Sequence, residues 1–151
     1  MSASWRDFES QEPEYAAWVK ARFERYNLGL LATLAADGSP RISGLEPIFF
    51  GDDLWLGLMP NSVKGADLHR DGRFALHSAT IDKDVSEGDA KIHGVALPVE
   101  DHLAAAAPPA AEGADLFRVS LVRVASVQVD VDRLVIKSWR PGRPLLTRYR
   151  R

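Results

Sequence analysis

Hydrophobic and polar positions follow a helical period near the start of the chain. After Pro13, aromatic and apolar side chains recur on one helical face, while charged residues fill the other. Before it, Ser4 and Asp7 form a capping-box-like start, and Pro13 limits that first helix to about two turns. The sequence therefore predicts two helices within residues 4–27, with a core-facing stripe of Tyr15, Trp18, Val19, Phe23 and Tyr26.

From Leu28 onward the hydrophobic period becomes two, which is typical of strands. Alternation over 28–36, an Asp37-Gly38 turn, and the segments 41–50 and 54–59 predict a three-stranded meander. Further strands are expected at 73–80, 90–99, 117–131 and 134–139. Six or seven strands with few, short helices favour an antiparallel β-barrel, because parallel strands need long crossover connections.

Composition narrows the classes of protein that this pattern allows. The 151 residues fit one domain spanning 1–151, with 46% hydrophobic and 26% charged residues. The net charge of -2 gives no general attraction to nucleic acid, and the absence of cysteine excludes disulfides and thiolate chemistry. A polar, acidic start and the lack of a long apolar run predict a cytoplasmic protein without export signal or membrane span.

Familiar catalytic and metal-binding motifs are absent from the sequence. It contains neither a dinucleotide-binding nor a P-loop glycine pattern, and neither a nucleophile elbow nor an H-E-x-x-H pair. The four histidines fall on different predicted elements without the spacing of a metal triad, so no metal site is predicted. His77 and His93 lie on adjacent predicted strands, which leaves open a metal or acid-base role for them. The histidines are His69, His77, His93 and His102.

The segment with the most chemical content pairs an arginine on one strand with a strand-to-helix junction. The two parts are Arg41-Ile42-Ser43 and Met59-Pro60-Asn61-Ser62-Val63-Lys64. A helix that starts at Ser62 and runs to about Arg70 presents free N–H groups, to which a hydroxyl, an ammonium and a guanidinium add further donors. Such a set suits an anion. The alternative is an ordinary capped helix with two solvated cations.

The order of these pieces resembles the pyridoxamine 5′-phosphate oxidase-like family of flavin-binding split barrels. The similar run is LATLAADGSPRISGLEPIFFGDDLWLGLMPNSVKGADLHRDGRFALHSA followed by GDAKIHGVALPVE, about half of the chain. It contains an apolar strand, a D-G-x-P hairpin, an Arg-led strand, a Ser-x-Lys helix start and an Arg-x-Ala-Leu strand. The resemblance implies a six- to seven-stranded antiparallel split β-barrel of the FMN-binding type.

The same resemblance implies a binding site. In the family, the Arg-led strand and a Ser-Arg-Lys helix start hold the flavin phosphate between two subunits of a homodimer. Arg41, Ser62 and Lys64 match those positions, whereas Val63 replaces the family's Arg and Glu46 replaces a Lys. Backbone amides near Ser43 and Leu45 are expected at the ring edge. The full expected cofactor-binding set is Arg41, Ile42, Ser43, Leu45, Met59, Pro60, Ser62, Lys64 and Trp139, with Met59 and Trp139 as apolar walls.

The resemblance implies an FMN- or deazaflavin-dependent oxidoreductase that transfers hydride to or from a small molecule. Because a flavin itself carries hydride chemistry, no catalytic side chain is assigned. The alternatives are a non-catalytic protein that binds a flavin, deazaflavin or haem for storage or sensing, and more distantly a nucleic-acid binder. The basic end of the chain, residues 140–151, is either a solvated tail or a set of arginines that approaches an anionic cofactor.

Overall fold

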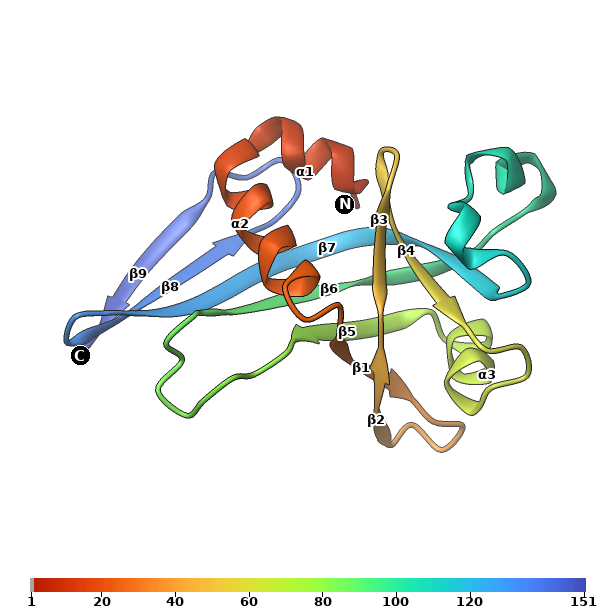
Figure 1. Ribbon diagram of the computed structural model, residues 1–151, viewed down its shortest axis with the longest axis horizontal. Coiled ribbons are helices and arrows are strands. Elements are labelled where there is room, and N and C mark those ends of the chain that lie inside the picture. Colours follow the sequence, from red (N-terminus) through yellow and green to blue (C-terminus); the bar gives the residue numbers. More distant parts are fainter. Residues whose placement is uncertain (1) are drawn as a thin grey trace.

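The computed structural model describes residues 2–151, except for the side chains of residues 101–103, so the expectation for the His102 side chain lies outside the described part. Three helices, nine strands and two 3-10 turns make up this part (Figure 1). They are α1 (Trp5–Gln11), α2 (Pro13–Glu24), β1 (Gly29–Leu34), β2 (Pro40–Leu45), β3 (Pro47–Phe50), β4 (Asp53–Leu58), α3 (Val63–Arg70), β5 (Arg73–Ser78), β6 (Asp89–Pro98), η1 (Asp101–Ala106), η2 (Pro109–Ala111), β7 (Asp115–Asp130), β8 (Arg133–Trp139) and β9 (Leu146–Arg150).

The two N-terminal helices form where the sequence predicts them. The Ser4 side chain accepts a bond from the Asp7 amide, and the Asp7 carboxylate accepts one from the Ser4 amide, which completes a capping box. Pro13 occupies the first turn of α2, where its missing N–H is harmless. Both helices lie on one face of the sheet (Figure 1). Their buried side chains Trp5, Phe8, Tyr15, Ala16, Val19 and Phe23 join the core.

All pairings between named strands are antiparallel, in the order β2-β1-β5-β6-β7-β4-β3, with β8 on β7 and β9 on β8. The core lies between α1, α2 and the inward side chains of the central strands. These alternate with outward ones, as a half-covered sheet requires. Their inward members include Leu31, Leu76, Ile92, Leu121 and Val124.

The predicted three-stranded meander is wrong. The expected strand 41–50 is interrupted at Glu46 and forms β2 and β3, which are not paired with each other and lie at opposite ends of the pairing order. The hydrogen-bonded sheet is therefore open between them. Alternation alone could not reveal this break, since it fixes which face a side chain occupies and not which neighbour a strand pairs with.

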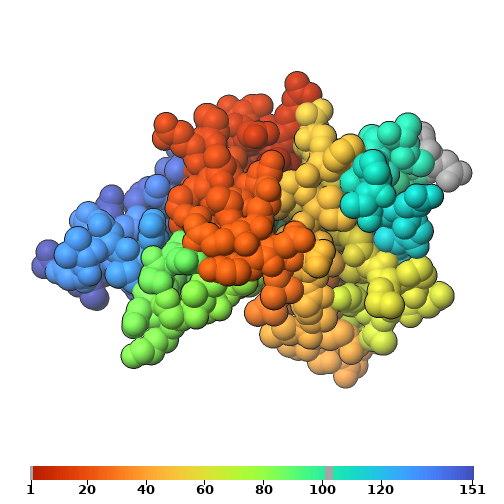
Figure 2. Space-filling model, viewed as in Figure 1, coloured from red at the N-terminus to blue at the C-terminus, as the bar shows by residue number. Residues whose placement is uncertain are grey.

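The predicted number of six or seven strands is also too low, because the segment 41–50 forms two strands and the C-terminal segment forms a further one. Residues 146–150 form β9, which pairs with β8 and has every side chain exposed. The guanidinium of Arg133 lies 4.2 Å from the ring centroid of Tyr149 and ties the two strands together. Together β8 and β9 project from one end of the molecule, in blue in Figure 2. Residues 146–150 of the basic segment 140–151 are thus one strand of an edge hairpin and not a solvated tail.

Candidate functional site

The start of α3 lies beside the edge strand β2, and their polar groups meet there. Ser62 has the extended backbone of an N-cap, and its hydroxyl accepts a bond of 3.0 Å from the Gly65 amide. The Lys64 ammonium donates a 2.6 Å bond to the Gly44 carbonyl of β2. The sequence-predicted helix start and arginine strand therefore form one corner of the molecule, called here the β2–α3 corner.

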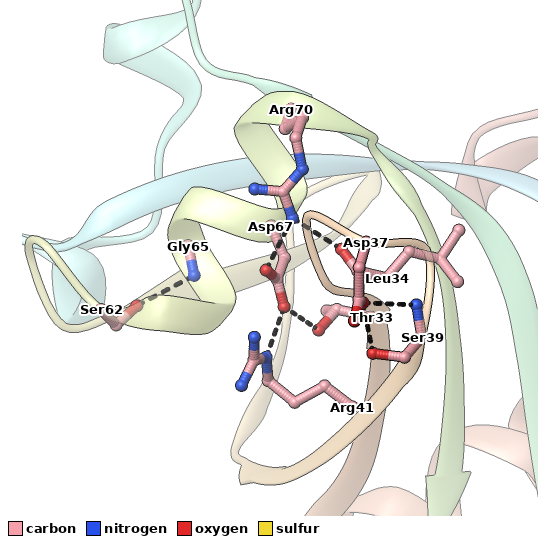
Figure 3. Close-up of polar contacts among 9 residues, drawn as sticks. All are labelled: Thr33, Leu34, Asp37, Ser39, Arg41, Ser62, Gly65, Asp67 and Arg70. Carbon is pink, nitrogen blue, oxygen red and sulfur yellow. Dashed lines mark hydrogen bonds and ion pairs between the residues drawn. The ribbon is translucent and has the colours of Figure 1, made fainter.

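A buried carboxylate organises this corner (Figure 3). The side chain of Asp67 on α3 is 3% exposed. One of its oxygens accepts bonds from Arg41 Nε at 2.7 Å and from the Thr33 hydroxyl at 2.8 Å, and the other accepts one from Arg70 Nη2 at 2.8 Å. Burial raises the pKa of Asp67, but these donors outweigh it and lower that pKa to about 2.

The network fixes the direction of the Arg41 guanidinium. The Asp67 carboxylate accepts a hydrogen bond from the Nε–H of Arg41, and the two Nη groups of Arg41 have no partner among the described residues. The Arg41 side chain is 39% exposed, so these groups remain accessible to a ligand. Sequence reasoning found Arg41 but missed the residues that hold it. Nothing in the local sequence of this short, polar helix indicates that Asp67 is buried. The sequence therefore does not predict Asp67 or its partners Thr33 and Arg70 as part of the site.

The backbone of β2 offers donors at its free edge. The Ala35 amide donates to the Ser39 carbonyl, so these two residues form a hydrogen-bonded pair. Hydrogen-bonded and non-hydrogen-bonded pairs then alternate along the β1–β2 hairpin. The amides of Ser43 and Leu45 consequently pair with β1. Those of Ile42 and Gly44 point to the open edge, which moves the expected donors by one residue.

Two further features of β2 concern side chains. The Ser43 hydroxyl is buried and has no hydrogen-bond partner, one of two such side-chain atoms in the described part of the chain. Leu45 is almost completely buried. An unpaired buried hydroxyl costs free energy, about 1–3 kcal/mol, unless something bonds to it.

Met59 and Pro60 are exposed at the start of the corner, where Met59 is 79% exposed and available as an apolar contact. Trp139 is placed elsewhere. It is completely buried against Phe8, with ring centroids 4.5 Å apart, and its indole donates to Gln11 at 3.0 Å. As a core residue under α1, Trp139 does not form a wall of this corner.

A hollow of about 580 Å³ lies on the other side of α3. Within it, His69 Nε2 lies 2.9 Å and 3.0 Å from the two carboxylate oxygens of Asp115. A Cβ added to Gly65 would lie 2.8 Å from the same carboxylate and 2.9 Å from the Ser62 hydroxyl. This side of the helix start already carries a negative charge. An anionic ligand at this helix start therefore meets favourable charges from Arg41 and Lys64 and an unfavourable charge from Asp115.

The outer face of the sheet, which α1 and α2 do not cover, carries the two histidines of the adjacent strands. His93 lies opposite Arg123 on β7, and His77 lies opposite Lys91 on β6. Burial, followed by the charges of Arg123, Lys91 and Arg140, lowers the pKa of His93. His77 lies 3.8 Å from Asp89. The described part of the chain contains no group of three His, Asp or Glu side chains placed to hold a metal ion.

No family model matches the chain, and neither does any curated protein. Solved structures do. A heme-binding protein from Mycobacterium smegmatis is 25% identical with a TM-score of 0.61; the match covers 82% of this chain and 57% of that one. PhzG from Burkholderia lata is 15% identical with a TM-score of 0.62, over 95% of this chain and 91% of that one.

An FMN-binding protein from Nostoc punctiforme, related to pyridoxamine 5′-phosphate oxidase, is 11% identical with a TM-score of 0.63, over 93% of this chain and 96% of that one. The chain therefore has the split-barrel fold of pyridoxamine 5′-phosphate oxidase-like proteins, as the sequence resemblance implied. Of these three structures with the same fold, one is of a heme-binding protein and one is of an FMN-binding protein. In the described residues no helix combines the length and the apolar character needed to cross a membrane.

Proposed function

We propose that the protein binds a flavin-type cofactor, FMN or a deazaflavin, in the β2–α3 corner and acts as an oxidoreductase on a small molecule. The observation that carries this proposal is the Arg41 guanidinium, which a buried carboxylate holds in place while both Nη groups stay free. A fixed two-pronged donor suits a phosphate. Lys64 adds a second positive charge at the same corner.

The residues of the corner fit such a cofactor. Ser62 uses its oxygen to cap α3, which leaves its hydroxyl proton for a phosphate oxygen. The edge amides of Ile42 and Gly44 provide donors for the polar edge of a flavin ring. Ser43 lies between them on the strand, with its hydroxyl buried. When bound, the flavin supplies the hydride chemistry, while these residues bind and orient it.

Leu45, Met59 and Pro60 belong to the same proposed site. Leu45 is a buried support at the end of β2, and Met59 and Pro60 are exposed next to the helix start. Trp139 no longer belongs to it, because this side chain is enclosed in the core. The proposed site therefore keeps eight of the nine expected residues.

A homodimer is part of the proposal. Three apolar side chains are exposed on the outer face here: Leu28 directly before β1 (42%), Leu30 on β1 (43%) and Ile42 on β2 (73%). Adjacent apolar side chains exposed on a sheet face are typical of an interaction surface. A second copy that covers this face would also enclose the cofactor corner at the edge of β2.

The test is direct titration of the purified protein with FMN and, in parallel, with the deazaflavin coenzyme. Substitution Lys64→Ala is expected to weaken binding several-fold, since it removes a charge-assisted contact to phosphate. The control is Lys83→Ala, because Lys83 is 92% exposed on the loop between β5 and β6. Equal affinity of the Lys64 variant and the wild type would contradict the site, and binding of neither cofactor would contradict the function.

Haem binding is a second candidate, which the outer face favours. Burial and the neighbouring cations lower the pKa of His93, which favours the neutral imidazole, the form that ligates iron. The cations Lys91, Arg123 and Arg140 act on the same histidine and would suit the carboxylates of a haem. Titration with haemin, followed by the Soret band, tests this candidate. His93→Ala should abolish the shift of the band, whereas His69→Ala, on α3, should not.

A further inference from the structure

A different hollow lies between α2 and the inner face of β7 and β8. This is the face of the sheet on which the N-terminal helices lie (Figure 1). Its volume of about 300 Å³ is at the small end of the range for small-molecule sites. It contains none of the residues of the β2–α3 corner, so it is independent of the proposed function. Its lining includes Glu12, Glu14, Tyr15, Trp18, Val135 and Lys137.

The apolar part of this hollow is held rigidly. The Tyr15 hydroxyl donates a 2.8 Å bond to the buried Ser126 hydroxyl of β7. The rings of Tyr15 and Trp18 are stacked with an angle of 15° between their planes, and Val135 lies on β8 beside them. Burial raises the pKa of Tyr15 to about 12, so this side chain stays neutral and bonded. The hollow therefore has a fixed aromatic wall.

The charged part of the lining is unpaired. On α2, Lys20 pairs with Glu24, and Arg25 beyond its end pairs with Glu87. By contrast, the side chains of Glu12, Glu14 and Lys137 form no ion pair with the residues that the structure describes; Lys137 only approaches the Tyr15 ring, at 5.8 Å. The carboxylates of Glu12 and Glu14, at the N-terminal end of α2, and the ammonium of Lys137, on β8, thus line one hollow without forming ion pairs with one another.

We propose that this hollow binds a zwitterionic amino acid with an apolar side chain. The ligand ammonium bonds to Glu12 or Glu14, its carboxylate bonds to Lys137, and its side chain lies against Trp18 and Val135. Each charge of the ligand then meets a charge of opposite sign, and its apolar part meets the fixed aromatic wall. A ligand with a single charge leaves one side of the lining unmatched.

The experiment is calorimetric titration of the full chain with three compounds of similar shape. L-phenylalanine carries both charges, phenethylamine carries only the ammonium, and 3-phenylpropionate carries only the carboxylate. L-phenylalanine is expected to bind most tightly and 3-phenylpropionate least tightly, because the lining has more acidic than basic groups. Absence of saturable L-phenylalanine binding at millimolar concentration would overturn the proposal.

Variants separate the two ends of the ligand. Glu14→Gln and Lys137→Met are each expected to weaken L-phenylalanine binding about fivefold, as loss of a partly exposed charged contact implies. The control Glu112→Gln should leave it unchanged, since the segment that contains Glu112 lies at the other end of the molecule (Figure 1). Lys137→Met should also remove the preference for L-phenylalanine over phenethylamine. If that preference is absent in the wild type, or if both variants bind normally, the zwitterion assignment is wrong.

Discussion

Asp67 shows how a single buried group sets up the proposed site. Its carboxylate receives three side-chain donors from β1, β2 and α3, and so joins the strand that carries Arg41 to the helix that carries Lys64. The sequence predicted the two cations, Arg41 and Lys64, because positively charged side chains beside a helix start are typical of an anion site. It could not predict their anchor, because burial of a carboxylate depends on how α3 packs against β1, which no local pattern encodes.

Substitution Asp67→Asn is expected to destabilise the protein by about 2 kcal/mol, since it weakens hydrogen bonds to charged groups in a buried position. Chemical denaturation measures this loss. The matched control is Asp130→Asn. Asp130 pairs with Arg133 at the same i,i+3 spacing as Asp67 with Arg70, but its side chain is 50% exposed, so a change within about 0.5 kcal/mol is expected.

The stability lost in the Asp67→Asn variant should depend on pH. The pKa of Asp67 falls from 3.8 to about 2 in the folded state, so its ionised form stabilises the fold above its unfolded pKa, and this contribution disappears as the pH falls towards the folded value. The stability difference between wild type and Asp67→Asn should therefore be constant near neutral pH and shrink between about pH 4 and pH 2. A difference that does not change over this range would contradict the assigned ion pairs.

Among the elements, β6 and β7 change their pairing register at a β-bulge between His93 and Gly94. His93 lies opposite Arg123, but Gly94 lies opposite Leu121, so one residue of β7 is extra. A Cβ on Gly94 would lie 2.4 Å from the Ser120 carbonyl, a distance that the backbone cannot accommodate without moving.

Substitution Gly94→Ala is therefore expected to cost about 2 kcal/mol or more in the free energy of unfolding, by overpacking of the core strands. Gly44→Ala is the control. A Cβ on Gly44 would contact only a Leu28 methyl group, at 3.9 Å. The free energy of unfolding of the Gly44→Ala variant should therefore match that of the wild type. Denaturant midpoints of the two variants give the comparison, and a normal midpoint for the Gly94 variant would contradict the bulge geometry.

At the scale of elements, the sequence predicted most strands and helices but not all of their partners. Period-two alternation and turn residues located β1, β4, β5, β6, β7 and β8 to within two residues at each end. It merged β2 with β3, because the alternation continues through Glu46 while the pairing partner changes. It also missed β9, since a run of basic residues suggests a solvated tail and pairing with β8 is a tertiary event.

At the scale of the whole molecule, the proposed homodimer makes a prediction about association. Ile42→Lys places a charge in the exposed apolar stretch of β1 and β2, which should dissociate a dimer that uses this face. Val131→Lys is the control, because Val131 is 94% exposed at the β7–β8 turn. Sedimentation velocity should show a dimer for wild type and the Val131 variant, and a monomer for the Ile42 variant. A monomeric wild type would refute the dimer.

The break at Glu46 has a consequence for the order in which the chain folds. The β1–β2 and β3–β4 hairpins join neighbouring segments and can form within microseconds, but β4 must then find β7, far along the chain. Loop-closure entropy is lost before that pairing contributes any stabilisation, so folding should take milliseconds to seconds. The two hairpins that flank Glu46 are therefore expected early in folding, and the pairing of β4 with β7 is expected later.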